Sequence, residues 1–372
     1  MALTLVPWYG FTYGFDLFEW GWFLLLLTFC EMSITAGYHR LWSHRAYQAH
    51  PLLKLVFALG GACALQNDCI TWASDHRRHH LYVDDNDKDP YSALRGFWYS
   101  HFGWMLRDYE STREDLSNVK DLLREPILVW QRKHYLVLLL LMNIGVPVLI
   151  GYIHGDIWAS LLLLGFLRLF LSQHFTYLIN SAAHLWGKRS YSPEQTARDN
   201  WIIALFTFGE GYHNYHHTFA FDYRNGIRWY HYDPTKWMIK FCSWFGLTWD
   251  LRACSAFRLE KTRLQVQFQK SLVRCEKLHD PSRWRQRLEE EYQQIITTLA
   301  HWYELKQQWY QVKSIQLSRE FHEKLHELDA EHLKARYLEL KSQLKRQRKS
   351  WKALQADFAM HFATASPVYI EH

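Results

Sequence analysis

The sequence predicts an all-α integral membrane protein that ends in a long helical extension. Three stretches are apolar and long enough to cross a bilayer as helices, at residues 19–37, 135–153 and 157–179. Aromatic residues make up 17% of the chain, and Trp and Tyr are favoured at membrane–water interfaces. Toward the C-terminus the apolar runs give way to charged, helix-like patterning. We therefore expect a membrane domain at residues 1–250 and a basic, coiled-coil-like helical extension at residues 251–372.

Two features complete the predicted membrane domain. Only residues 154–156 separate the second and third spans, which predicts a helical hairpin that returns the chain to the side it left. The stretch 52–70 is also apolar, but Gly60, Gly61 and the pair at 67–68 interrupt it. Residues 1–16 are apolar and aromatic yet too short to cross as a helix, so they form either a surface segment or the end of a span.

Nine of the 22 histidines fall into four clusters. The clusters read HRLWSH (His39, His44), HRRHH (His76, His79, His80), NSAAH (Asn180, His184) and HNYHH (His213, His216, His217). Positions i, i+3 and i+4 share one helix face, so each HxxHH set predicts a patch of three imidazoles. His39 and His44 are five residues apart, and we expect them to converge because a helix ends near Leu41. Imidazole suits Fe, Zn, Cu or Ni, and nine imidazoles are enough for two metal ions.

A shared metal centre constrains the membrane topology. If residues 52–70 crossed the bilayer, the clusters before and after them would lie on opposite faces, roughly 30 Å apart. We therefore predict that this stretch is an interfacial or re-entrant helix. The loop at 154–156 carries no Lys or Arg, whereas the histidine-bearing face carries many. The positive-inside rule then places the histidines on the cytoplasmic face.

The motifs resemble the stearoyl-CoA (delta-9) desaturase family of integral-membrane di-iron enzymes. The resemblance covers roughly residues 1–250 and extends beyond the histidines to ITAGYHRLWSH at 34–44, GFWYSHFGW at 96–104 and GEGYHNYHHTFAFDY at 209–223. It implies transmembrane helices beneath a cytosolic helical cap that holds the di-iron site.

The resemblance also implies specific site residues. The metal ligands would be His39, His44, His76, His79, His80, His184, His213, His216 and His217, with Asn180 reaching one metal through a water. Asn67 and Asp75 fall where the family contacts the acyl-CoA head, and Tyr177 stands near the substrate tunnel. No catalytic side chain beyond the metal ligands is implied.

The implied activity is O2-dependent introduction of a cis double bond, with delta-9 the expected position, into a long-chain acyl-CoA at two Fe ions. The sequence contains no haem-binding segment, nicotinamide fingerprint or four-cysteine cluster, so electrons must come from a cytochrome b5-like protein or a ferredoxin with its reductase. No nucleic-acid partner is expected. The alternative enzyme is a di-iron membrane lipid hydroxylase, and the non-enzymatic alternative is a scaffold that stores or senses metal.

The C-terminal extension carries the basic excess of the chain. Residues 251–372 hold 22 Lys+Arg against 15 Asp+Glu, whereas the rest of the chain is nearly balanced. A seam of apolar residues recurs at spacings of four and three, and Pro281 marks a new helix start. That seam consists of Leu288, Tyr292, Ile295, Leu299 and Trp302. The basic run at 345–352 is either a solvated helix face or a contact for anionic lipid or an acidic partner.

Several other polar residues have open interpretations. The carboxylates that are candidates to orient the imidazoles are Asp75, Asp84, Asp85, Asp87, Asp89 and Glu210, although the acids at 84–89 also fit a solvated loop. Glu31 lies inside the first predicted span, where a carboxylate is costly. It is either a polar structural contact or a residue of the tunnel or site, or the bounds of the span are misplaced. His174 in the third span is an ordinary histidine or supports the site. The six cysteines predict reduced, structural thiols.

Overall fold

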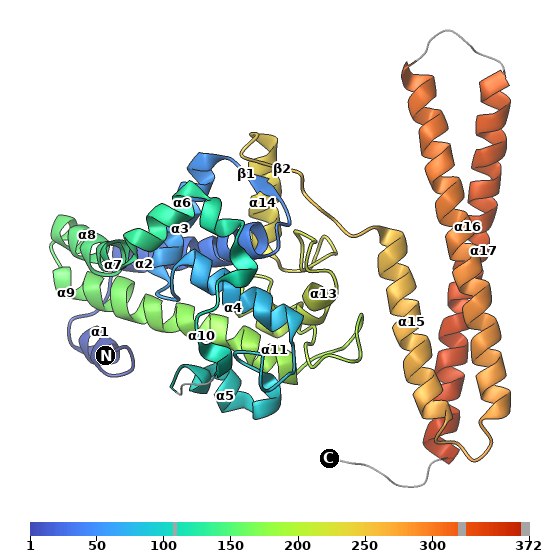
Figure 1. Ribbon diagram of the computed structural model, residues 1–372, viewed down its shortest axis with the longest axis horizontal. Helices are drawn as coiled ribbons and strands as arrows, with labels where there is room; N and C mark the ends of the chain where they lie inside the picture. The colour runs from blue at the N-terminus through green and yellow to red at the C-terminus, as the bar shows by residue number, and fades with distance from the viewer. Residues whose placement is uncertain (107–109, 319–324, 366–372) are drawn as a thin grey trace. The chain divides into compact units, whose positions relative to one another are not determined.

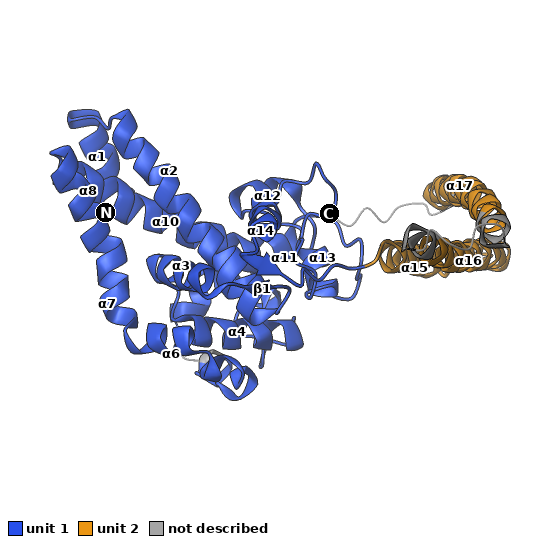
Figure 2. Ribbon diagram, turned by 90° about the horizontal axis from the view of Figure 1, so that it is seen from above, with its two compact units in different colours: residues 1–254 blue, residues 255–372 orange. Residues whose placement is uncertain are grey.

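The computed structural model describes residues 1–106, 110–318 and 325–365, which are mostly helical (Figure 1). The chain divides into two compact units, Met1–Cys254 and Ser255–His372 (Figure 2). The single sheet among the described residues pairs β1 (Gln48–Ala49) with β2 (Thr248–Trp249) in antiparallel register. The prediction of a helical protein is confirmed.

Three composite helices are long and apolar enough to cross a membrane: Leu17–Ser43, Tyr135–His154 and Ile157–Leu185. The three predicted spans are therefore confirmed, and this is a membrane protein. Each composite helix contains a π-helical stretch. Their parts are α2 (Leu17–Met32) and η1 (Ser33–Ser43), then α7 (Tyr135–Leu140), η7 (Leu141–Gly145) and α8 (Val146–His154), then α9 (Ile157–Ser160), η8 (Leu161–Leu167), α10 (Arg168–Asn180) and α11 (Ala182–Leu185).

Local sequence signals start and stop these helices. Asp16 and Glu19 form a capping box at the start of α2, in which each side chain accepts from the other residue's backbone N–H. The predicted hairpin is present: Gly155 ends α8 with a φ of 97°, and the Asp156 carboxylate caps α9. His154 Nε2 lies 2.8 Å from Asp16 Oδ2, so the hairpin is joined to the start of the first span.

The apolar stretch at 52–70 does not form one helix. It divides between α3 (Pro51–Cys63), which is only 13 residues long, and the first turn of α4 (Cys69–Leu81), which the Asp68 carboxylate caps. Positive φ angles at Leu65 and Asn67 turn the chain between the two helices. This turn brings α4 back against η1, so the histidines before and after the stretch share one site, as the predicted interfacial or re-entrant placement required.

Short helices make up the rest of the first unit. They are α1 (Leu5–Thr12), α5 (Phe97–His101), α6 (Pro126–Lys133), α12 (Trp201–Phe206), α13 (His213–Thr218), α14 (Pro234–Trp244) and the single 3₁₀ turns η2 (Ala93–Arg95), η3 (Gly103–Leu106), η4 (Glu110–Thr112), η5 (Ser117–Val119) and η6 (Leu122–Arg124). The largest apolar core of this unit lies between the first span, α3 and α4.

The second unit consists of α15 (Ala256–Cys275), α16 (Ser282–Ser318) and α17 (Leu325–Ala365), and α16 packs lengthwise against α17 (Figure 1). The predicted helix break at Pro281 is confirmed. The predicted apolar seam of α16 packs against Leu344, Trp351 and Phe358 of α17. Knobs-into-holes packing of the coiled-coil kind remains a prediction.

Candidate metal centre

Five histidines converge at the C-terminal end of the first span. His39 lies in η1, and His44 is the C-cap residue of η1. His76 and His80 lie in α4, and His216 lies in α13. Their ligand nitrogens all lie within 4.8 Å of one another. The Nε2 atoms face the centre of the cluster, with 2.9 Å between His39 and His216 and 2.8 Å between His44 and His76.

Four further histidines form a second cluster next to the first. They are His79, His184, His213 and His217, from α4, α11 and α13. His213 Nε2 lies 3.1 Å from His184 Nε2 and 3.0 Å from His217 Nε2. All nine predicted histidines therefore belong to two neighbouring, buried or half-buried groups.

The sequence predicted that each HxxHH set forms its own patch of three imidazoles. This prediction is wrong, because each set is divided between the two clusters. The i and i+4 histidines of α4 (His76 and His80) join the five-histidine cluster, whereas His79 points into the other cluster. In α13 the pair His213 and His217 joins the four-histidine cluster, and His216 joins the first. The i+3 position lies about 60° from one end of the i, i+4 pair, so each helix contributes ligands to both sides.

The expectation that a helix ends near Leu41 is wrong. The first span continues as the π-helix η1 through Ser43, and the His44 N–H donates to the His39 carbonyl at 3.1 Å, which is an i→i+5 bond. One π-helical turn therefore separates the two histidines and places their ring centroids 4.8 Å apart.

The cluster chemistry fits bound metal. Burial, followed by the neighbouring imidazoles, lowers the pKa values of His44, His76, His213 and His216 well below the usual value, so these rings are neutral at physiological pH. Neutral imidazole is the form that ligates metal ions. His79 Nε2 is buried and has no hydrogen-bond partner among the described residues, as expected for a metal-ligating nitrogen.

A carboxylate orients one histidine of each cluster. Glu210 lies 2.9 Å from His39 Nδ1, and Asp89 lies 2.9 Å from His79 Nδ1, so both rings direct Nε2 inward. Of the remaining candidate acids, Asp84 acts indirectly: it binds the Thr196 hydroxyl, which lies 2.7 Å from His184 Nδ1. A solvated-loop interpretation therefore fails for Asp84 and for fully buried Asp89.

The other candidate acids do not contact a cluster histidine. Asp75 pairs with Arg78, and burial raises the pKa of Asp75 to about 6. Asp85 and Asp87 lie in the turn before Asp89, where Asp85 caps the Asp87 backbone N–H and faces Lys88.

Glu210 is itself held by a buried ion network that sequence reasoning missed. The Arg40 guanidinium lies 2.8 Å from Glu210 and 3.0 Å from Asp233, and all three side chains are buried. Burial raises the pKa of Glu210, but Arg40 and His39 outweigh it and lower the pKa below its usual value. Glu210 is therefore a carboxylate. An arginine next to His39 at the end of an apolar span was the available signal.

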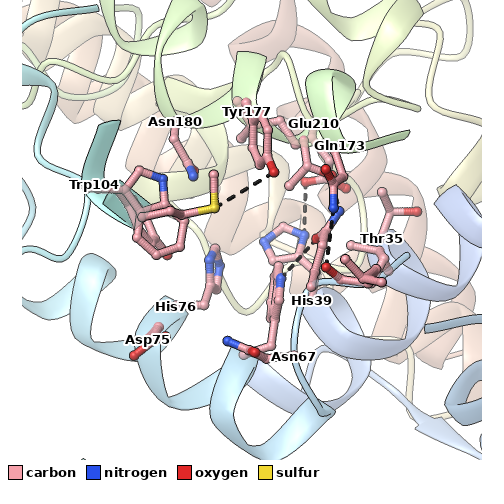
Figure 3. A pocket seen from close by; sticks show the side chains of 18 of the residues that line it. Thr35, His39, Asn67, Asp75, His76, Trp104, Gln173, Tyr177, Asn180 and Glu210 are labelled. Atoms are coloured by element: carbon pink, nitrogen blue, oxygen red, sulfur yellow. Dashed lines mark hydrogen bonds and ion pairs between the residues drawn. The ribbon is translucent and has the colours of Figure 1, made fainter. Parts of the chain in front are cut away.

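A cavity of about 630 Å³ opens against the five-histidine cluster (Figure 3). His39 and His76 line it together with Asn67, Asp75 and Tyr177. Asn180 also lines the cavity, opposite His76 in Figure 3. The structure therefore brings every predicted substrate-contact residue, and the predicted water-bridging Asn180, to one cavity.

A fatty acid desaturase family model matches residues 17–252. This chain belongs to the fatty acid desaturase family. It is 45% identical to acyl-CoA desaturase 1 of Saccharomyces cerevisiae over 240 residues, which are 64% of this chain and 47% of that protein. It is 43% identical to a probable acyl-CoA desaturase of Schizosaccharomyces pombe over 252 residues, 68% of this chain and 52% of that protein. The chain therefore spans about half the length of these fungal relatives.

A vertebrate relative is covered more fully. Stearoyl-CoA desaturase 5 of Homo sapiens is 41% identical over 253 residues, which are 66% of this chain and 76% of that protein. The matched desaturase region ends at residue 252, so it includes both histidine clusters and the cavity but leaves out α15, α16 and α17.

Two polar residues predicted within the membrane spans lie outside the histidine clusters. Glu31 is buried and its Oε1 atom has no hydrogen-bond partner among the described residues. His174 Nδ1 lies 3.0 Å from His101 Nε2, so it links α10 to α5. Neither residue lines the cavity. The six cysteines are all free and buried.

Proposed function

We propose that this chain is an O2-dependent fatty acyl-CoA desaturase that introduces a cis double bond, at delta-9, into a saturated long-chain acyl group. The observation that carries the proposal is a pair of neighbouring histidine clusters, one of which lines a cavity beside the ends of the first and third membrane spans. Membership of the desaturase family and the names of the relatives support this chemistry.

The proposed cofactor is a pair of Fe ions, one for each cluster. Imidazole nitrogen suits iron, and the nine rings would hold two ions without adding negative charge. The iron pair would supply the reduction of O2 and the removal of two hydrogens from adjacent carbons. Asn180 would reach one ion through a water from its place on the cavity wall.

The protein's own groups orient the metal ligands and the substrate. Glu210 and Asp89 keep the Nδ1 atoms of His39 and His79 occupied, so that both rings ligate through Nε2. Asn67 and Asp75 would bind the acyl-CoA head, and Tyr177 would line the path of the acyl chain. No side chain acts as a separate catalytic acid or base, because the strong C–H bonds of a methylene require metal chemistry.

We further propose that the histidine face is cytoplasmic and that electrons arrive from a cytochrome b5-like protein or a ferredoxin. The loop at 154–156, which lies at the opposite end of the spans, has no Lys or Arg.

The test is expression in a desaturase-deficient cell, with fatty acids read by gas chromatography and double-bond localisation. The expected product is a cis monoene, and H213A should abolish it at equal protein level. A hydroxylated acyl chain would instead support the hydroxylase alternative. No new product from an iron-loaded chain would overturn the assignment.

A further inference from the structure

Helix α14 presents an exposed aromatic stripe. Trp237, Phe241 and Trp244 of the helix and its C-cap residue Phe245 are 46%, 53%, 69% and 66% exposed, and they recur at spacings of four, three and one. Such spacing places all four rings on one side of a helix. Four large aromatic side chains side by side are unusual on a surface that faces only water.

The opposite side of α14 is fixed to the membrane domain. Thr235, Ile239 and Cys242 are buried, and α14 packs against η1. The hydroxyls of Thr235 and Thr35 lie 2.7 Å apart, which joins the start of α14 to the second half of the first span. The helix therefore holds its aromatic stripe at a fixed place relative to the spans.

The surroundings of α14 are continuous with the third span. The Phe206 ring of α12 lies 5.8 Å from Phe175 of α10, and Thr235 of α14 donates to the Phe208 carbonyl just beyond α12. α12 itself exposes Trp201 and Ile202. In Figure 1, α14 runs across the direction of α10, as a helix that lies in the membrane plane must do beside a helix that crosses it.

We propose that α14 is an in-plane membrane helix whose aromatic stripe sits in the headgroup region of the bilayer. Aromatic rings are favoured at that depth, and an amphipathic helix buries its apolar side there. Lys240, exposed beside the stripe, would reach the lipid phosphates from the same helix. The proposal adds a lipid-binding surface outside the three spans and does not depend on the proposed function.

A spin-label experiment on the full chain in phosphatidylcholine nanodiscs tests the proposal. All six native thiols are buried, so F241C, W244C and F245C each provide one reactive site, and the unmutated chain measures background labelling. The labels lie in the second half of the helix, away from the cap residue Asp233. The matched controls are S243C, half-buried on the same helix, and K120C, exposed on another surface.

We expect collisions with O2 to exceed those with a water-soluble nickel chelate at all three stripe positions. At K120C the order should reverse, and S243C should be shielded from both reagents. Nickel preference at the stripe would show that it faces water. Shielding from both reagents there would show that protein covers it, as a partner or second copy would. Either result overturns the proposal.

A second measurement needs no substitution. A photoreactive phosphatidylcholine in the same nanodiscs should label the tryptic peptide at 241–252 of the native chain and spare the peptide at 190–198. Equal labelling of the two peptides, or none at 241–252, would also overturn the proposal.

Discussion

Glu210 and Asp89 each orient a histidine of a different cluster, so each carboxylate supports one of the two proposed metal sites. Each accepts from the Nδ1 side of one histidine, and the two histidines belong to different clusters. Their own surroundings differ: Arg40 balances the charge of Glu210, whereas Asp89 accepts from the backbone N–H groups of Asp84 and Tyr91. A change at either carboxylate should therefore affect one metal site and spare the other.

We predict that E210Q and D89N each lower metal affinity about 10–100-fold at one cluster, because a ligand histidine loses its anionic partner. After dialysis against a chelator, each variant should retain close to one metal ion per chain where the unmutated chain retains two. Mass spectrometry of metal content provides the measurement. D87N, which changes an exposed acid in the same loop, should retain both ions. Equal losses in D87N would contradict the prediction.

Asn67 allows a clean test of substrate contact. Its φ of 73° is a conformation that glycine adopts without strain, so N67G removes the side chain and leaves the backbone unchanged. Loss of one polar contact costs about 1 kcal/mol, so we predict a roughly five-fold higher KM for acyl-CoA with little change in kcat. D250G, at a surface position with a φ of 50°, is the control. An unchanged KM in N67G would remove Asn67 from the site.

Only some of the residues of the histidine site could be predicted from the sequence. The nine histidines were identifiable because their spacing is regular. Asp233 and Thr196 were not, because they act through long-range contacts that no local spacing encodes. The assignment of ligands to one cluster or the other was also out of reach, because it depends on how α4 and α13 face each other.

At the scale of elements, the π-helix η1 is the least predictable feature. Hydrophobic periodicity cannot distinguish i→i+5 from i→i+4 bonding over a few residues, so the five-residue separation of His39 and His44 suggested a helix end. Glycines of α3 allow this helix to lie close to η1. A Cβ at Gly61 would come within 2.1 Å of the Tyr38 ring, one residue before His39.

We predict that G61A destabilises the protein by about 1–3 kcal/mol, because overpacking forces α3 away from η1. The thermal midpoint of the purified protein, followed by size-exclusion chromatography after heating, should fall. G21A is the matched control, since a Cβ at Gly21 in α2 meets no atom within 4 Å. A similar fall for G21A would show that close packing at Gly61 is not the cause.

At the scale of the whole molecule, composition predicted the spans and the helical tail, because both are long and strongly patterned. The packing of the short helices around the histidines could not be predicted, since many of them have eight residues or fewer. Side-chain contacts, such as the one between Thr35 and Thr235, stabilise these short helices more than their intrinsic helix propensity does.

The C-terminal extension presents a row of lysines on its last helix. Lys341, Lys345, Lys349 and Lys352 are exposed and share one side of α17. If this side attracts an acidic electron donor, deleting 256–372 should raise the KM for that donor several-fold, while activity with a small chemical reductant stays unchanged. Each exposed charge pair contributes about 0.2–1 kcal/mol, so substituting Lys341, Lys345 and Lys349 by Gln should reproduce most of the effect.

Salt and charge controls separate attraction by this surface from a general loss of charge. Because exposed pairs are screened, the difference between the full chain and the truncated chain should shrink as ionic strength rises. The triple variant K261Q/R263Q/R274Q removes the same charge from α15 and should leave the donor KM close to that of the full chain. The structural division after Cys254 leaves both histidine clusters intact in the truncated chain, so activity with the small reductant reports folding. Unchanged activity and donor KM after truncation would mean that the donor binds the membrane domain alone.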